Sequence, residues 1–305
     1  MKTTHSTTQE ECTLSTAAAL RGLRPNISAF IWYDSLRIYS NKTFNPDIIN
    51  IMNQSCVRNE HTPFLETHKN YLLSNVSGLP ALESYLHAHV YDHRQAIVRD
   101  YWKDACVALV TPTSDERMDG CGADASQQNG TYIRNLDPAV ADAWTTAHVE
   151  AVQATTMAVS SLGGVILGKL PVQLGVSTNG ILQEGCNGNN ITITSLRAAA
   201  ALASTTKTRL LFECHSDSSS ESSMAAFLVG AGVDQYWGFG PWVTQAGGFE
   251  SSWLPEYEHP LGEPTSDATY DSTTSIWSRT FASGTSVTFN AKTEQGTITW
   301  GQGNS

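Results

Sequence analysis

The sequence predicts an α/β fold: a (β/α)8 TIM-type barrel that lacks its first two strands in this chain and is followed by a small C-terminal antiparallel β meander. Short apolar segments alternate with helical patterns up to residue 240, which is typical of parallel β-α-β units. Six such strand segments are present, whereas a closed barrel has eight. Residues 276–300 then show the period-2 alternation of an antiparallel sheet.

Two helices are predicted before the middle of the chain. Residues 10–23 are rich in Ala and Leu, and Gly22 and Pro25 mark the end of this helix. Residues 98–109 form an amphipathic pattern, because apolar side chains at 3-4-4 spacing fall on one face: Val98, Tyr101, Trp102, Ala105 and Leu109.

Asp137 and Pro138 mark the start of a long helix, since Asp is a favoured N-cap and Pro is favoured at the first helical position. We expect this helix to end at about Ser160, and we expect two more helices at 193–204 and 222–232. The apolar runs between helices predict the parallel strands, at about 29–33, 118–124, 164–168, 180–185, 209–215 and 234–240.

The two strands that would complete a barrel lie either within residues 40–92 or before residue 1. We favour the second alternative, because the long polar stretch 40–92 contains few β-rich runs. The barrel domain is then expected to span residues 10–262. The meander is expected to span residues 263–305, with turns at Ser283-Gly284 and Gln295-Gly296.

Composition excludes several classes of function. Asp and Glu number 29 against 18 Lys and Arg, which gives a formal net charge of −11. No basic cluster is present, so we expect no nucleic-acid partner. No run of 18 apolar residues is present, so we expect no membrane span. We expect a monomer that uses no cofactor.

Six N-x-S/T sequons suggest a secreted glycoprotein. Residues 1–25 contain no apolar stretch that could serve as a signal peptide, so an Asn- and Thr-rich cytosolic protein is the alternative. We favour a secreted protein whose first segment is absent from this chain. The sequons are at Asn26, Asn41, Asn53, Asn75, Asn129 and Asn190.

The six cysteines are scattered and form no CxxC or CxxH pair, so no structural metal site is expected. In a secreted protein some of them should form disulfide bonds. Cys121 and Cys214 lie in predicted core strands and are also candidates for free buried thiols.

Titratable residues end or follow four of the predicted strands. The carboxyl ends of barrel strands form the catalytic face, and buried carboxylates are costly unless they are paired or functional. Asp119 lies nearer the start of its strand, and for it a structural role in a cap or loop is the alternative. The candidates at strand ends are Asp34, Asp124, Glu184, and Glu213 with His215.

Paired carboxylates indicate glycoside hydrolysis, in which one group protonates the leaving oxygen and the other attacks the sugar or activates water. The aromatic stretch 237–257 could supply a platform for sugar rings, with Trp237 as the best candidate, or it could close the end of a barrel. No GxSxG, P-loop or GxGxxG motif is present. His87, His89 and His93 have no partner at a recognised metal-ligand spacing, so no metal is expected there.

The segments VYDHRQAIVRDYWKDACVAL, MDGCGADAS, NGILQEGC and LLFECHSD resemble a group of glycoside-hydrolase-like (β/α)8 barrel proteins, distantly similar to endo-α-1,4-polygalactosaminidases. The resemblance covers roughly residues 10–300 and extends to WLPEYEHPLGEP and the tail. It implies that Asp124 and Glu184 form the functional pair and that two strands precede FIWYDS. This chain departs from the group at Gly122, where a bulkier residue is usual, and in the added acid of FECH.

Two functions therefore stay open. The first is a glycosidase that cleaves a poly- or oligosaccharide. In it Asp124 and Glu184 would be catalytic, with the substrate contacted by Asp34, Asp119, Glu213, His215 and Trp237. The second is a non-catalytic carbohydrate-binding barrel. Glu184 follows an apolar strand, and desolvation favours the protonated form of a carboxyl group, so we assign it the proton donor's role and Asp124 that of nucleophile or base. The reverse assignment stays open.

Overall fold

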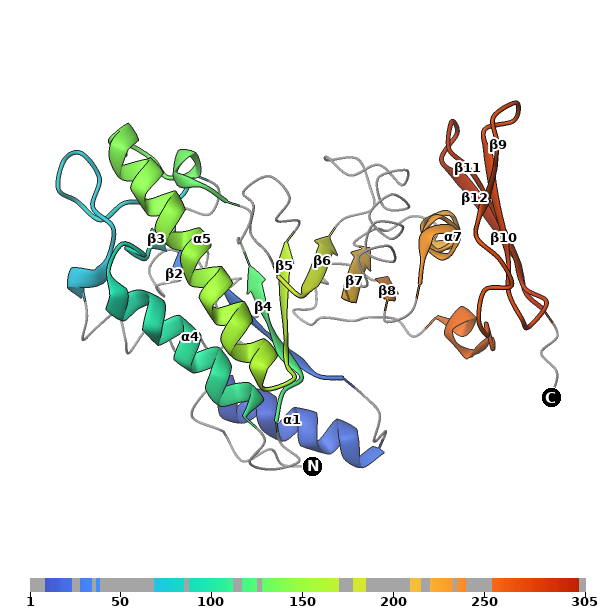
Figure 1. The fold of residues 1–305 in the computed structure, drawn as a ribbon, viewed down its shortest axis with the longest axis horizontal. Helices are drawn as coiled ribbons and strands as arrows, with labels where there is room; N and C mark the ends of the chain where they lie inside the picture. Colours follow the sequence, from blue (N-terminus) through green and yellow to red (C-terminus); the bar gives the residue numbers. More distant parts are fainter. Residues whose placement is uncertain are drawn as a thin grey trace, which may run out of the picture. The chain divides into compact units, whose positions relative to one another are not determined.

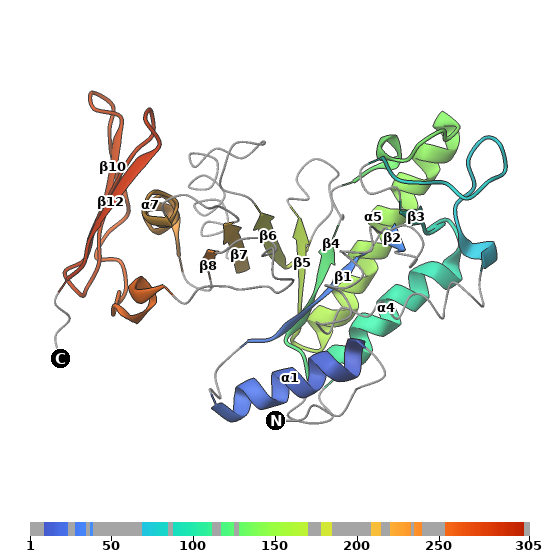
Figure 2. The same cartoon turned by 180° about the vertical axis from the view of Figure 1, so that it is seen from behind.

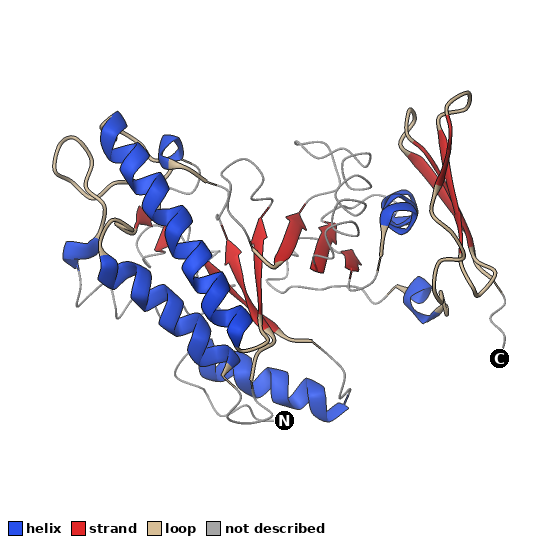
Figure 3. Cartoon of the chain, in the orientation of Figure 1, coloured by secondary structure: helices blue, strands red, loops and turns tan. Residues whose placement is uncertain are grey.

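A computed structural model shows the protein as two compact units, residues 1–181 and 182–305, and each is described by itself. Figure 1 labels the helices and strands, Figure 2 shows them from behind, and Figure 3 colours them by type. The structure describes residues 9–23, 28–34, 37–38, 69–84, 88–111, 117–124, 128–169, 178–184, 209–214, 220–232, 235–239 and 254–301.

Three hydrogen-bonded parallel strands lie wholly within the first unit. They are β1 (Phe30–Asp34), β4 (Gly120–Asp124) and β5 (Val165–Lys169), and β4 lies in the middle. The parallel pairing predicted for these three segments is present, with bounds within one or two residues of those expected. Closure into a barrel stays a prediction.

Three helices accompany this sheet: α1 (Gln9–Leu23), α4 (Ala96–Val110) and α5 (Pro138–Ser161). α4 and α5 lie side by side, and they pack on β4 and β5 respectively (Figure 1). The predicted N-cap of α5 is confirmed, because the Asp137 carboxylate accepts a hydrogen bond from the Ala139 amide at 2.9 Å.

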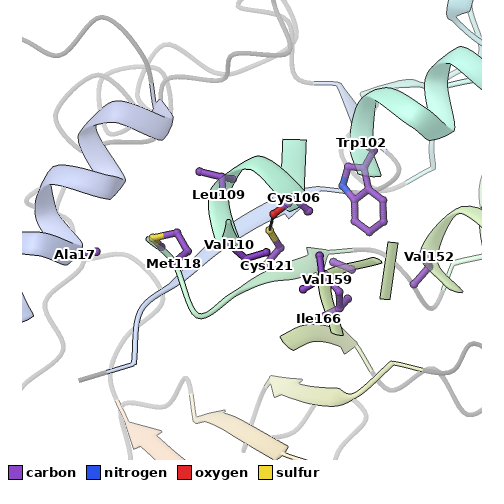
Figure 4. Packing of buried hydrophobic residues seen from close by; sticks show 11 residues of the cluster. Ala17, Trp102, Cys106, Leu109, Val110, Met118, Cys121, Val152, Val159 and Ile166 are labelled. Carbon is purple, nitrogen blue, oxygen red and sulfur yellow. Dashed lines mark hydrogen bonds between the residues drawn. The ribbon is translucent and has the colours of Figure 1, made fainter. Parts of the chain in front are cut away.

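The main core of this unit lies between the sheet and its helices (Figure 4). Cys106 on α4 and Cys121 on β4 are buried free thiols, and the Cys121 thiol lies 3.9 Å from the Cys106 carbonyl oxygen. Cys56 and Cys186 lie outside the described residues, so disulfide bonds stay a prediction. The core residues are Ala17, Trp102, Cys106, Leu109, Val110, Met118, Cys121, Ala123, Val152, Val159 and Ile166.

A second, smaller core lies where the chain runs from η1 (Lys69–Tyr71) towards α4. Here β2 (Arg37–Ile38) pairs with β3 (His89–Val90) in antiparallel fashion. The sequence did not predict this pair, because two residues are too few to show a period-2 pattern. Trp144 of α5 is fully buried in this core with Leu73, Ala81, Val90 and Ile133.

In the second unit, β7 (Arg209–Cys214) and β8 (Gln235–Phe239) pair in parallel as predicted, and α7 (Ser220–Gly230) connects them. β6 (Gly180–Glu184) spans the division between the units. The helix predicted at 193–204 lies outside the described residues.

The C-terminal meander is confirmed as a four-stranded antiparallel sheet of order β12-β11-β10-β9, preceded by η4 (Pro255–Glu258). α7 packs on three of its strands. The Arg279 guanidinium on β10 donates to carbonyl groups at the end of α7, including that of Leu228 at 3.1 Å. The strands are β9 (Thr269–Asp271), β10 (Ile276–Thr280), β11 (Ser286–Asn290) and β12 (Gln295–Thr299).

One predicted turn of the meander is wrong. Gly284 has the positive φ of 84° expected of a turn glycine, but Gln295-Gly296 begins β12. The turn lies just before it, where the Asn290 side chain accepts hydrogen bonds from the Lys292 and Thr293 amides at 2.9 and 3.0 Å. Gly296 serves packing instead, because a Cβ there would lie 2.5 Å from the Ala225 Cβ of α7.

Among the described residues, no helix combines the length and the apolar character that crossing a membrane requires.

The Gly120→Ala variant should lose about 3 kcal/mol or more of unfolding free energy, because an added Cβ would lie 1.9 Å from the backbone oxygen of Val165. Urea unfolding measures this. Gly22→Ala is the matched control, because a Cβ there meets nothing within 4 Å, and its change should stay below about 1 kcal/mol. Equal effects of the two substitutions would contradict the close approach of β4 and β5.

Candidate functional site

Two of the predicted site residues lie side by side in the first unit. Asp34 is the last residue of β1 and Asp124 the last residue of β4, and the two are register partners in the parallel sheet. Adjacent strands lie about 4.8 Å apart, so two acids at partner positions are immediate neighbours. The structure therefore places Asp34 next to Asp124 in the sheet, a neighbour that the sequence did not predict.

The alternation of β4 separates its two faces. Cys121 and Ala123 belong to the core beneath α4 and α5, so positions 120, 122 and 124 belong to the other face. Gly120 allows β4 to approach β5, because a Cβ there would also meet the Phe30 ring at 2.9 Å. The strand thus combines small residues with an acid at its carboxyl end, where barrel enzymes place catalytic groups.

Lys169 is a residue that the sequence analysis missed. It is the last residue of β5, and the residue before it, Gly168, is the register partner of Ala123. Lys169 therefore lies at the same edge of the sheet as Asp124, at the end of the adjacent strand. The signal is present in the sequence, since Lys169 ends an apolar run just as the acids do.

Asp119 occupies the opposite, amino-terminal side of β4. Its carboxylate accepts hydrogen bonds from the Ala29 amide at 2.7 Å and from the Arg21 guanidinium at 2.6 Å. These contacts tie α1 and the start of β1 to β4. The geometry supports the structural alternative for Asp119, and the predicted contact with substrate stays untested.

A buried polar cluster lies beside the connection from β4 to α5. The His93 and His148 rings are 4.9 Å apart, and the Trp144 ring lies 4.9 Å from that of His148. Burial lowers the pKa of His148 well below its usual value, and the proximity of His93 lowers it further, whereas a hydrogen bond to the Gln128 backbone acts in the opposite direction. His148 is therefore neutral in the folded protein at neutral pH.

The same part of α5 holds the backbone on either side of this cluster. The Trp144 indole donates to the Tyr91 carbonyl at 2.7 Å, and the Gly130 amide donates to the Thr145 hydroxyl at 2.8 Å. Gly130 is required here, because a Cβ would lie 2.4 Å from the Ala141 carbonyl oxygen. Helix α5 thus fixes the chain where it returns from the end of β4.

The second unit contains the other predicted site residues. Glu184 is the last residue of β6, and Glu213 lies next to the end of β7 as the register partner of Gly238. Trp237 is partly buried, and its ring meets that of Tyr257 edge-on at 6.1 Å. His215 lies outside the described residues. Because Glu184 and Asp124 belong to different units, their pairing stays a prediction.

The described residues contain no group of three or more His, Cys, Asp or Glu side chains that could hold a metal ion. Of the three histidines considered for such a site, His87 lies outside the described residues. Burial lowers the pKa of His89, and the His93 ring packs on those of Trp144 and His148.

The pH dependence of stability should report the buried state of His148. The unfolded chain takes up a proton at this residue below about pH 6.5, whereas the folded chain does not until lower pH, so stability falls as the pH decreases through this range. In His148→Gln this loss should shrink by up to about 1.4 kcal/mol per pH unit, measured by urea unfolding between pH 8 and 5.

The quantity compared is the slope of unfolding free energy against pH, because His148→Gln also changes core packing and so shifts the free energy at every pH. His259→Gln, which alters an exposed histidine of the second unit, should keep the slope of the wild-type protein. If all three proteins lose stability equally on acidification, His148 does not carry this pH dependence.

Asp119→Asn should lower the unfolding free energy by about 1 kcal/mol, because a neutral amide pairs poorly with Arg21 and accepts more weakly from Ala29. Asp142→Asn, an exposed change on α5, is the matched control and should have little effect in urea unfolding. An unchanged stability together with weaker glycan binding would support substrate contact instead.

Comparison with protein families identifies one match. Residues 21–285 match the model of a hypothetical glycosyl hydrolase family 15. A search of curated proteins gives no significant match. The expected resemblance to glycoside hydrolases is thus confirmed at the level of the family, and the finer similarity to polygalactosaminidases stays a prediction. Because the matched residues make up most of the chain, the protein belongs to this hypothetical glycosyl hydrolase family.

Proposed function

We propose that the protein hydrolyses glycosidic bonds of a poly- or oligosaccharide with two carboxyl groups, those of Asp124 and Glu184. The observation that carries the proposal is the position of Asp124. It ends β4, between β1 and β5, beside a second acid, Asp34, in a chain that belongs to a hypothetical glycosyl hydrolase family. The carboxyl ends of parallel strands are where α/β barrel enzymes carry out their chemistry.

The two acids take different roles. Asp124 acts in its ionised form, as the nucleophile or as the base that activates water, and Glu184 donates its proton to the leaving oxygen. Glu184 suits the donor's role because Ile181 and Leu182, earlier in the same strand, are buried, and an apolar environment favours the protonated form. The distance between the two carboxyl groups decides whether the reaction retains or inverts the anomeric configuration.

Aromatic side chains in the second unit are candidates for sugar binding. Trp237 lies on β8 two residues from its carboxyl end, and Tyr257 meets it edge-on. A flat apolar ring with a polar tip suits the faces of sugar rings. Trp237 is therefore proposed to bind substrate.

A carbohydrate substrate fits the proposed secretion of the protein. Two of the sequons lie in described turns. The Asn75 side chain accepts hydrogen bonds from the Ser77 and Leu79 amides, and that of Asn129 accepts from the Thr131 amide. Both asparagines are partly exposed and lie in polar surface loops, where glycosylated residues are found.

The test begins with the wild-type protein, which is assayed on a panel of polysaccharides by detection of new reducing ends. A glycoside of the cleaved sugar with a dinitrophenyl leaving group is then used to compare variants. Such a leaving group needs little protonation, so Glu184→Gln should retain most of the activity, whereas Asp124→Asn should lose at least about 1,000-fold.

The exposed change Asp142→Asn is the control for the loss of one negative charge and should leave kcat/KM unchanged. Small and equal losses in Asp124→Asn and Glu184→Gln would exclude this pair. Binding of a glycan without any cleavage by the wild-type protein would favour the non-catalytic carbohydrate-binding alternative.

A further inference from the structure

Three strands of the first unit end at one edge of the sheet, and each ends in a charged residue. These residues are Asp34 on β1, Asp124 on β4 and Lys169 on β5. Asp34 and Asp124 are register partners. Ala123 is the register partner of Gly168. Asp124 and Lys169 are the next residues of their two strands and therefore occupy neighbouring positions. Asp124 therefore occupies the middle of a row with an acid on one side and a cation on the other.

Two acids at partner positions oppose each other's ionisation. The backbones of adjacent strands are about 4.8 Å apart, so register partners are neighbours, and a neighbouring carboxylate raises the pKa of a carboxyl group. A cation on the next strand acts in the opposite sense, and its ammonium lies at the end of a flexible stem of four carbons. A cation in the row therefore favours the ionised form of the carboxyl group beside it.

The setting of Lys169 supports this role. Val165, Ile166 and Leu167, which precede it in β5, are all buried, and Lys169 itself is partly buried. A lysine at such a position packs its stem along apolar surface and presents its charge at the edge. Among the three described strand ends of this unit, Lys169 is the only cation.

The other charged residues near β4 belong to α4, which covers the opposite face, or lie at the amino-terminal end of the strand, as Asp119 and Arg21 do. α4 covers the face of β4 that contains Cys121, and its charged residues are Arg99, Asp100, Lys103 and Asp104. Lys103 pairs with Asp100 at 2.7 Å. On the α5 side, His148 is buried against His93 and Trp144. Within the described strands of this unit, Lys169 and Asp34 are thus the charged neighbours of Asp124 in the sheet.

We propose that Lys169 is a positioning residue that keeps the Asp124 carboxylate ionised beside Asp34, so that Asp124 rather than Asp34 is the group ready to act on substrate. This inference rests on the proposed function, because it names the residue that prepares Asp124 for its role there. Lys169 acts through Asp124 and takes no part in bond making itself.

The test follows the titration of the Asp124 carboxyl carbon by NMR in protein labelled with 13C at aspartate side chains. The signal of Asp124 is the one that disappears in Asp124→Asn. In Lys169→Met this signal should titrate about one pH unit higher than in the wild-type protein, because an opposite charge is lost and Asp34 remains. In Lys169→Arg it should titrate close to the wild-type position.

Two further variants separate the charge effect from a structural one. Lys103→Met removes a lysine from α4 on the other side of β4, and it should leave the titration of Asp124 unchanged. The double variant Lys169→Met with Asp34→Asn should shift the titration back towards the wild-type position, because both charged neighbours are then absent. An unchanged titration of Asp124 in Lys169→Met would overturn the proposal.

If Lys169→Met does not fold, the reciprocal measurement tests the same interaction. In Asp124→Asn, the amine of Lys169 loses its anionic neighbour, so its pKa should fall. The amine is observed by 15N NMR in protein labelled at lysine side chains. An amine that titrates as in the wild-type protein would equally overturn the proposal.

Activity separates this inference from the proposed function. If the wild-type protein cleaves a glycan, the acid limb of its kcat/KM profile should move up in Lys169→Met by the shift seen by NMR, and Lys169→Arg should restore it. If the wild-type protein cleaves no glycan of the panel, the proposed function fails. The two titrations still decide whether Lys169 controls the ionisation of Asp124.

Discussion

The close approach of β4 and β5 is the constraint on which the first unit depends. A Cβ at position 120 would lie 1.9 Å from the Val165 carbonyl oxygen, so only glycine permits this spacing. Cys121 and Ala123 of β4 are small enough for α4 to pack directly on the strand. The small residues Gly120, Cys121 and Ala123 therefore reflect close packing of β4 against its neighbours. As a result, Asp124 is held at the end of a strand that has neighbours on both edges and a core beneath it.

Long-range polar contacts fix the two ends of this arrangement. At one end Arg21 and the Ala29 amide bind Asp119, and the two side chains of the ion pair are 98 positions apart in the sequence. At the other end Trp144 binds the Tyr91 carbonyl, and His148 lies against His93. Buried polar groups are costly unless they have partners, so these contacts favour a single placement of the chain around β4.

The sequence predicted what local signals specify. The N-cap at Asp137, the apolar periodicity of α4 and the short apolar strands each depend on residues within one segment, and their observed bounds differ by few residues from those expected. The partnership of Asp34 with Asp124, the position of Lys169 in the same row and the His93–His148 pair depend on register and packing between distant segments, which no local pattern contains. Gly296 shows a related limit of prediction from sequence. This glycine is needed for the packing of α7 on the strand, but a glycine at this place in the sequence predicts a turn.

Asp119 and Asp124, at the two ends of β4, show how position along a strand separates a structural role from a proposed catalytic one. Asp119 has a cation and a backbone amide as partners, so its charge stabilises the packing of α1 and β1 on β4. Asp124 ends the same strand beside another acid, an arrangement that opposes ionisation and does not stabilise the fold by itself. Local choices that conflict with stability are characteristic of functional sites, because selection for activity maintains them at the expense of folding free energy. The conflict at Asp124, together with its absence at Asp119, is the physical reason for proposing that the carboxyl end of β4 carries the chemistry.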